Sequence, residues 1–147
     1  MSGEDGAIAQ LDGDRPVLVP PGVYDVAFDG YSTFMMLGRA PKVRLRFRIM
    51  TMGEHFEKPI SRFCNVKRLI GRPGPSGRFK VGFHCDFLRE FAGLFGVPSR
   101  LDRIPMSNFE NHIFSATVRT VEKGSRQEQI PGGLTYSIIA KLRSIKH

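Results

Sequence analysis

The stretch that decides the fold is residues 42–50, KVRLRFRIM, in which basic and apolar residues alternate from Lys42 to Ile49. Strict alternation is typical of a β-strand with one face in the core and one in solvent, because successive side chains point to opposite faces. The expected core face carries Val43, Leu45, Phe47 and Ile49. The opposite face carries Lys42, Arg44, Arg46 and Arg48. The sequence therefore predicts a half-buried strand whose outer face is cationic.

Four more segments are predicted to be strands. Residues 23–29 alternate in the same way after a Pro-Pro-Gly turn, and a connector containing Gly30 and Gly38 separates them from the first stretch. A turn at Gly53-Glu54 leads into a returning strand over residues 56–67. Residues 112–122 and 135–144 are again alternating and rich in β-branched residues, which favour strands.

One helix is predicted between the third and fourth of these strands. Apolar residues recur at helical spacing over residues 87–95, Gly96 is placed as a C-terminal cap, and Pro98 follows. The order of three strands, a helix and two strands is that of a five-stranded Greek-key OB-fold barrel with one helix between strands three and four. The expected class is mainly β, and an α+β sandwich with the same element order is the alternative.

The composition indicates one folded domain with a cationic body. A chain of 147 residues suits one domain, which we expect over residues 17–147, behind a flexible acidic N-terminal arm at residues 1–16. The formal net charge is +8, but residues 1–30 carry −5, so residues 31–147 carry +13. A body this basic favours a polyanionic partner.

Several classes of protein are disfavoured by the sequence. No apolar run approaches the length of a membrane span and the N-terminus is acidic, so we expect a soluble, cytoplasmic protein with no membrane partner. Two cysteines make no disulfide framework. His84 and Cys85 with Cys64 lack a fourth ligand at any usual spacing, and no catalytic constellation stands out. We therefore expect no metal, no cofactor and no enzymatic activity.

The cationic face of residues 42–50 has the spacing of a phosphate-binding track. Its alternate arginines lie about 7 Å apart along a strand, close to the phosphate spacing of an extended single strand. We expect bases to stack on Tyr31 and Phe34, in the connector beside Arg39. We also expect stacking on Phe63, which points to the opposite face of its strand from the next residue, Cys64. The alternatives are a strand face kept soluble by charge and, for Phe63, core packing.

Two loops extend the predicted interface. Residues 68–82 combine Gly and Pro with basic residues and are expected to form a mobile loop that folds over a bound strand, the alternative being a solvated loop. The connector at residues 123–134 is expected to close on the other side. The predicted basic contacts outside residues 42–50 are Arg39, Arg62, Lys67, Arg68, Arg72, Arg78, Lys80, Lys123 and Arg126.

Short motifs over residues 20–145 resemble a known family. They are Pro21-Gly22-Val23-Tyr24, Phe47-Arg48-Ile49 before Gly53-Glu54, Phe63-Cys64-Asn65 and Leu94-Phe95-Gly96. This pattern resembles the OB-fold single-stranded DNA-binding proteins of bacteriophages and mobile genetic elements. The resemblance implies an accessory of replication or recombination at the nucleoid of a bacterial host. It also implies that the protein binds single-stranded DNA without sequence preference and that its partners are replication or recombination proteins. The resemblance is compatible with a homo-oligomer.

Two rival functions fit the same charge. One is an RNA-binding OB domain, and the other is a protein-interaction module of a mobile element that binds an acidic host protein.

Overall fold

The computed structural model describes residues 11–12, 15–122 and 135–147, and its main element is an antiparallel sheet of six strands. These strands are β3 (Gly22–Met36), β4 (Ala40–Ile49), β5 (Pro59–Asn65), β7 (Gly74–Pro75), β9 (Ile113–Val121) and β10 (Tyr136–Ile145). Their order is β10-β9-β3-β4-β5, and the short β7 pairs with β3 beside this path. The protein is mainly β, as the sequence predicted.

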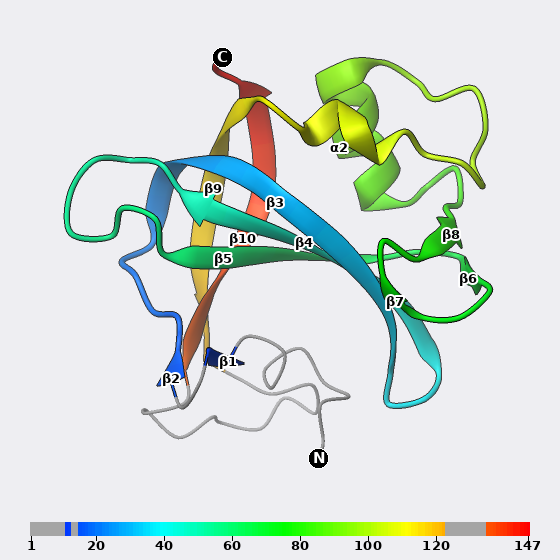
Figure 1. Ribbon diagram of the computed structural model, residues 1–147, viewed down its shortest axis with the longest axis horizontal. Coiled ribbons are helices and arrows are strands. Elements are labelled where there is room, and N and C mark those ends of the chain that lie inside the picture. Colours follow the sequence, from blue (N-terminus) through cyan, green and yellow to red (C-terminus); the bar gives the residue numbers. More distant parts are fainter. Residues whose placement is uncertain (1–10, 13–14, 123–134) are drawn as a thin grey trace.

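The sheet coils strongly but is not closed into a barrel. In Figure 1, β9 and β10 run steeply across the direction of β4 and β5. The edge strands β5 and β10 contact each other, but no hydrogen-bonded ladder joins them. The side chain of Glu90, on helix α2 (Asp86–Phe95), binds both edges instead, through Arg62 of β5 and the backbone N–H of Leu142 on β10. The order of the predicted strands and helix therefore agrees with the prediction, but the predicted closed barrel is absent because no hydrogen bonds between the described strands close the sheet.

Strand β4 has the predicted faces. From Lys42 to Ile49 the apolar residues are all buried and the basic residues are all partly exposed. The buried side chains Val43, Leu45, Phe47 and Ile49 form one core cluster with Phe87 and Phe91 of α2. Burial of large apolar side chains contributes about 1.5 to 3 kcal/mol for each, so this alternating pattern determines which way the strand faces.

Strand β3 is longer than the sequence predicted. It continues to Met36, so most of the expected connector is strand, and only residues 37–39 link it to β4. An irregularity in the β3–β4 register at Asp29 allows the strand to continue with a shifted phase. The next residue, Gly30, has a φ of 126°, and a Cβ there would lie 2.6 Å from Nη2 of Arg46. Glycine therefore satisfies both the backbone conformation and the close approach of the arginine.

The segment predicted as a mobile loop, residues 68–82, is an ordered hairpin. Strand β6 (Arg68–Ile70) pairs with β8 (Arg78–Lys80), while β7 in the hairpin tip pairs with β3. Phe79 and Val81 are buried in the core cluster. The prediction of a mobile loop was wrong because two apolar residues among the glycines and prolines hold the segment against the core.

Helix α2 agrees with the prediction. Its first turn contains the acid Asp86, and Gly96 is its C-terminal cap. Gly96 has a φ of 93°, and its N–H donates to the carbonyl of Ala92. The 3₁₀ turn η1 (Met106–Phe109) was not predicted, and it brings Phe109 into the core. No helix in the described ranges has the length and apolar character needed to cross a membrane.

The segment predicted as a flexible acidic arm, residues 1–16, contains a short ladder. β1 (Leu11–Asp12) pairs with β2 (Arg15–Pro16), whereas residues 1–10 lie outside the described part. From Val17 the chain is tied to β10, because Ser137 donates its N–H to the Val17 carbonyl and binds the backbone of Val19 through its hydroxyl.

Candidate nucleic-acid interface

The outer surface of β3, β4 and β5 brings cations and aromatic rings together. Residues that pair across antiparallel strands share a face. Arg44 pairs with Ser32 of β3 and Phe63 of β5, and the neighbouring rows hold Arg46 with Ser61 and Lys42 with Asn65. We call this surface the basic face. It comprises Phe34, Lys42, Arg44, Arg46, Ser61, Phe63 and Asn65.

Two arginines at the centre of the basic face have no acidic partner among the described residues. Nε of Arg44 donates to Oγ of the buried Ser61 at 2.9 Å. The guanidinium of Arg46 lies over Gly30. Burial and the charge of Arg46 lower the pKa of Arg44. The two cations thus repel each other, and an anion bound between them would remove that repulsion.

The predicted stripe of three arginines is reduced to two. Arg48 forms an ion pair with Asp29, the residue at the β3 irregularity. Lys42 Nζ donates to Oδ1 of Asn65 and remains a cation without an acidic partner in the described ranges. The cationic centre of the face is therefore Arg44 and Arg46, with Lys42 beside them.

Two phenylalanines supply the aromatic part of the basic face. The rings of Phe34 and Phe63 meet edge to face, with centroids 6.2 Å apart, and both are partly exposed. Phe63 lies on the outer face, as its parity predicted, and outside the core cluster. Phe34 belongs to β3 and not to a connector.

The predicted role of Tyr31 does not fit its position. Tyr31 pairs with the buried Leu45 and its ring contacts Phe79, with centroids 6.1 Å apart, so it faces the core side of β3. Burial raises the pKa of its phenol. Tyr31 is therefore on the wrong side of the sheet to stack on a base bound at Arg44.

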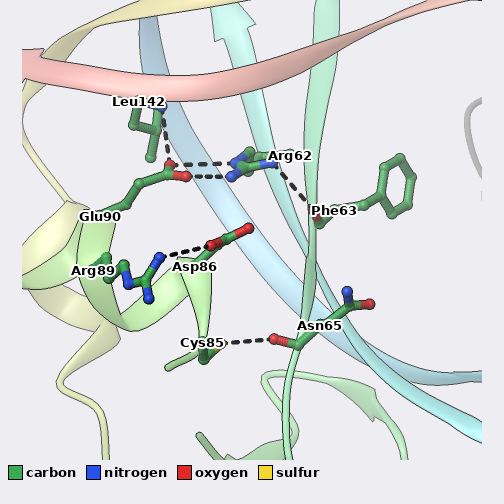
Figure 2. Close-up of polar contacts among 8 residues, drawn as sticks. All are labelled: Arg62, Phe63, Asn65, Cys85, Asp86, Arg89, Glu90 and Leu142. Carbon is green, nitrogen blue, oxygen red and sulfur yellow. Dashed lines mark hydrogen bonds and ion pairs between the residues drawn. The ribbon is translucent and has the colours of Figure 1, made fainter. Parts of the chain in front are cut away.

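Arg62 was also predicted as a contact and lies on the core side. It pairs with Leu45, and its side chain is 13% exposed. Figure 2 shows it directed at Glu90, whose side chain is 12% exposed. Burial by itself lowers the pKa of Arg62, but the hydrogen bond and the charge of Glu90 outweigh it and the pKa is raised. This guanidinium is occupied inside the protein.

The basic residues of the β6–β8 hairpin belong to a separate two-stranded sheet and not to the strands of the basic face. Arg68 pairs with Lys80, and both alternate with the core-facing pair Leu69 and Phe79. Phe79 contacts the core side of β3, and the hairpin tip β7 pairs with Ser32 and Thr33 of β3, at the border of the basic face. Its exposed cations are Arg68, Arg72 and Arg78, with Lys80 partly exposed.

Four predicted contacts remain. Arg39 is exposed in the β3–β4 connector, and its backbone N–H donates to the carbonyl of Met36. Lys67 is exposed just beyond β5. Lys123 and Arg126, in the connector between β9 and β10, lie outside the described residues.

A pocket of about 600 Å³ adjoins the basic face at the free edge of β5. We call it the edge pocket. It is lined by residues 62–67 and 82–86. Phe63 and Asn65 belong both to the basic face and to this pocket, and Phe83, which is 78% exposed, also lines it. Phe83 was not predicted as a site residue, although a phenylalanine in a Gly-Phe-His segment outside any apolar period was a signal.

The chemistry of the two cysteines differs although both line the edge pocket. Burial raises the pKa of the Cys64 thiol to about 12. Cys85 is partly exposed, and its Sγ donates to the carbonyl of Asn65 at 2.9 Å (Figure 2). The described residues contain no group of three or more His, Cys, Asp or Glu placed to hold a metal ion.

We expect iodoacetamide to alkylate Cys85 and to spare Cys64 in the native protein at about pH 8. The thiolate is the reactive form, and a buried thiol with a pKa of about 12 supplies almost none of it. Peptide mass spectrometry after timed labelling measures both rates. In denaturant the two cysteines should react alike, and equal rates in the native protein would contradict the placement of Cys64.

Comparison of the chain with known protein families, curated proteins and solved structures found no match. The function of the basic face is therefore inferred from its own geometry. It offers two arginines without acidic partners in the described ranges, a lysine and two partly exposed rings on one surface. Such a surface can bind phosphates and stack on bases.

Proposed function

We propose that this protein binds single-stranded DNA through the basic face, largely without sequence preference and without catalysis. One observation carries the proposal: Arg44 and Arg46, which have no acidic partner among the described residues, share a strand face with the paired rings of Phe34 and Phe63. Cations along a groove with aromatic rings beside them are the usual means of binding single strands.

The arrangement favours a single strand over a duplex. Alternate residues of β4 are about 7 Å apart, a spacing that suits successive phosphates of an extended chain. The rings of Phe34 and Phe63 are useful only to bases that are unstacked, and a duplex keeps its bases inside. Arginine also binds phosphate through two parallel N–H groups, which makes it better suited to this role than lysine.

The strand arrangement, which is consistent with an OB-like β fold, supports the same function. The strand order β10-β9-β3-β4-β5 with α2 after β5 is the order of an OB barrel, whose second and third strands carry the ligand surface. Here those strands are β4 and β5. In this proposal Glu90 takes the place of the hydrogen bonds that would close the barrel between β5 and β10. A role in replication or recombination of a phage or mobile element follows from the sequence resemblance.

The double variant Arg44→Ala/Arg46→Ala tests the proposal. We expect weaker binding of single-stranded DNA of every sequence, because phosphate contacts carry no sequence information. The slope of log K against log salt should fall by about 1.4, at about 0.7 for each phosphate that the variant no longer neutralises. Fluorescence anisotropy over a series of salt concentrations measures both quantities.

The matched control is Arg119→Ala/Arg143→Ala, which removes the same charge from exposed positions on β9 and β10. It should leave the slope close to that of the wild type. An Arg44/Arg46 variant that binds as tightly as this control would refute the role of the basic face.

The same assay separates the rival functions when single-stranded DNA, duplex DNA and single-stranded RNA of equal length are compared. Preference for single-stranded DNA supports the proposal, and preference for RNA favours an RNA-binding domain. If none of the three binds, the proposal is wrong, and an acidic protein partner becomes the better explanation of the charge.

A further inference from the structure

We propose that the edge pocket receives one nucleobase of the bound strand, held between Phe63 and Phe83. The inference rests on the proposed function and extends it from phosphate binding to a defined base site. It assigns a role to Phe83, which neither the core nor the basic face uses.

The edge pocket continues the basic face. Phe63 is the cross-strand neighbour of Arg44, and adjacent strands lie about 4.8 Å apart, so the pocket begins one strand spacing from the arginine. Figure 2 shows Phe63 and Asn65 projecting from β5 on the side away from Arg62. A strand whose phosphates lie on Arg44 and Arg46 can therefore direct its next base past Phe63.

The lining of the edge pocket suits a flat, neutral ring with polar edges. Phe63 and Phe83 both line the pocket, and an aromatic ring can stack on a base. Oδ1 of Asn65 already accepts from Lys42, which leaves the amide NH₂ to donate to an oxygen or ring nitrogen of a base.

The charges around the edge pocket disfavour a phosphate as its occupant. Arg62, Lys67 and Asp86 all line it. Arg62 is already paired with Glu90, and Asp86 forms an exposed ion pair with Arg89, so the wall carries charges of both signs. A carboxylate in the wall repels a phosphate and tolerates a neutral base.

An added peptide strand is also disfavoured at this edge. Strand addition needs free backbone groups, and the carbonyl of Asn65 already accepts from Cys85 Sγ. A base, unlike an added strand, can stack on the exposed ring of Phe83 without forming hydrogen bonds to the backbone of β5.

The test compares an oligothymidine with an oligomer of the same length made of abasic sites, which keeps the phosphates and lacks the bases. We expect Phe83→Ala to bind the oligothymidine about 5- to 150-fold more weakly, the ratio equivalent to about 1 to 3 kcal/mol of stacking. Its affinity for the abasic oligomer and its salt slope should not change. Phe83→Tyr, which keeps the ring, should bind both oligomers as the wild type does.

Val97→Ala is the matched control, because Val97 is 79% exposed and does not line the edge pocket. It should leave both affinities unchanged. Cys85 provides a second measurement, since an occupied pocket should slow its alkylation with the oligothymidine more than with the abasic oligomer.

The outcomes distinguish the two proposals. If Phe83→Ala keeps the wild-type ratio of affinities for the two oligomers, the base site is wrong even though the basic face can still bind phosphates. A peptide partner would then be the remaining occupant of the edge pocket. If the wild type binds neither oligomer, the proposed function fails and the base site fails with it.

Discussion

Glu90→Ala is expected to lower the free energy of unfolding by about 3 to 5 kcal/mol, the usual effect of removing one partner of a buried ion pair. The carboxylate accepts from Nε of Arg62 at 3.3 Å and from the N–H of Leu142 at 3.0 Å. Its removal leaves a buried guanidinium without its counterion and an edge N–H without an acceptor. Urea denaturation followed by circular dichroism measures the change.

Two variants show whether charge or geometry is responsible. Glu90→Gln retains an oxygen for Leu142 but not the negative charge, so it should be destabilised less than Glu90→Ala. Arg89→Ala breaks an exposed pair with Asp86 on the same helix and should change stability by at most about 1 kcal/mol. A Glu90→Ala protein as stable as Arg89→Ala would contradict the bridge between β5 and β10.

Phe109→Ala is expected to cost about 3 to 5 kcal/mol of stability, which is typical of a buried phenylalanine replaced by alanine. Phe109 is 1% exposed and sits at the centre of an aromatic cluster. Its ring partners are Phe28, Phe87, Phe91, Phe95 and Phe114. These come from the sheet and from α2, so the cavity would loosen the helix on the sheet. Thermal and chemical unfolding measure the decrease.

Phe63→Ala is the comparison for Phe109→Ala, because it removes the same group from the outer face. It removes the edge-to-face packing on Phe34, which is worth about 0.5 to 1.5 kcal/mol for an aromatic pair. Its main effect should be on binding of single-stranded DNA. If both variants are destabilised equally, Phe63 belongs to the core and not to the basic face.

The two stability predictions also concern the edge pocket. Residues 82–86 form its far wall and lead directly into α2. Phe109 packs against the apolar side of α2, and Glu90 binds the sheet from the polar side of the same helix. A loosened helix would therefore widen the pocket, so binding measurements on Phe83 variants require a fully folded protein.

Local pattern was sufficient to locate most of the elements. The alternation of residues 42–50 predicted both faces of β4, and helical spacing with Gly96 predicted the extent of α2 to within one residue. The parity of Phe63 relative to Cys64 predicted its outward position. Each of these features depends on neighbours within a few residues, because side-chain period and capping are local properties of the backbone.

The position of Tyr31 depended on an irregularity that alternation does not reveal. Counting by twos from the inward Phe28 places Tyr31 on the outer face. The register shift at Asp29 adds one residue to β3 and reverses the phase, so Tyr31 faces the core and Phe34 the solvent. A strand pattern alone does not say where such an extra residue is accommodated.

The sequence by itself determined the order of the five longer strands and the helix and the cationic outer face of β4, because these follow from local periodicity. Only the tertiary structure decided which cations are free to bind. Arg48 is paired with Asp29, 19 residues away, and Arg62 with Glu90, 28 residues away. Such partners are brought together by the register of the sheet and the packing of α2. Charge pairing over that distance depends on the whole fold, whereas alternation depends only on adjacent residues.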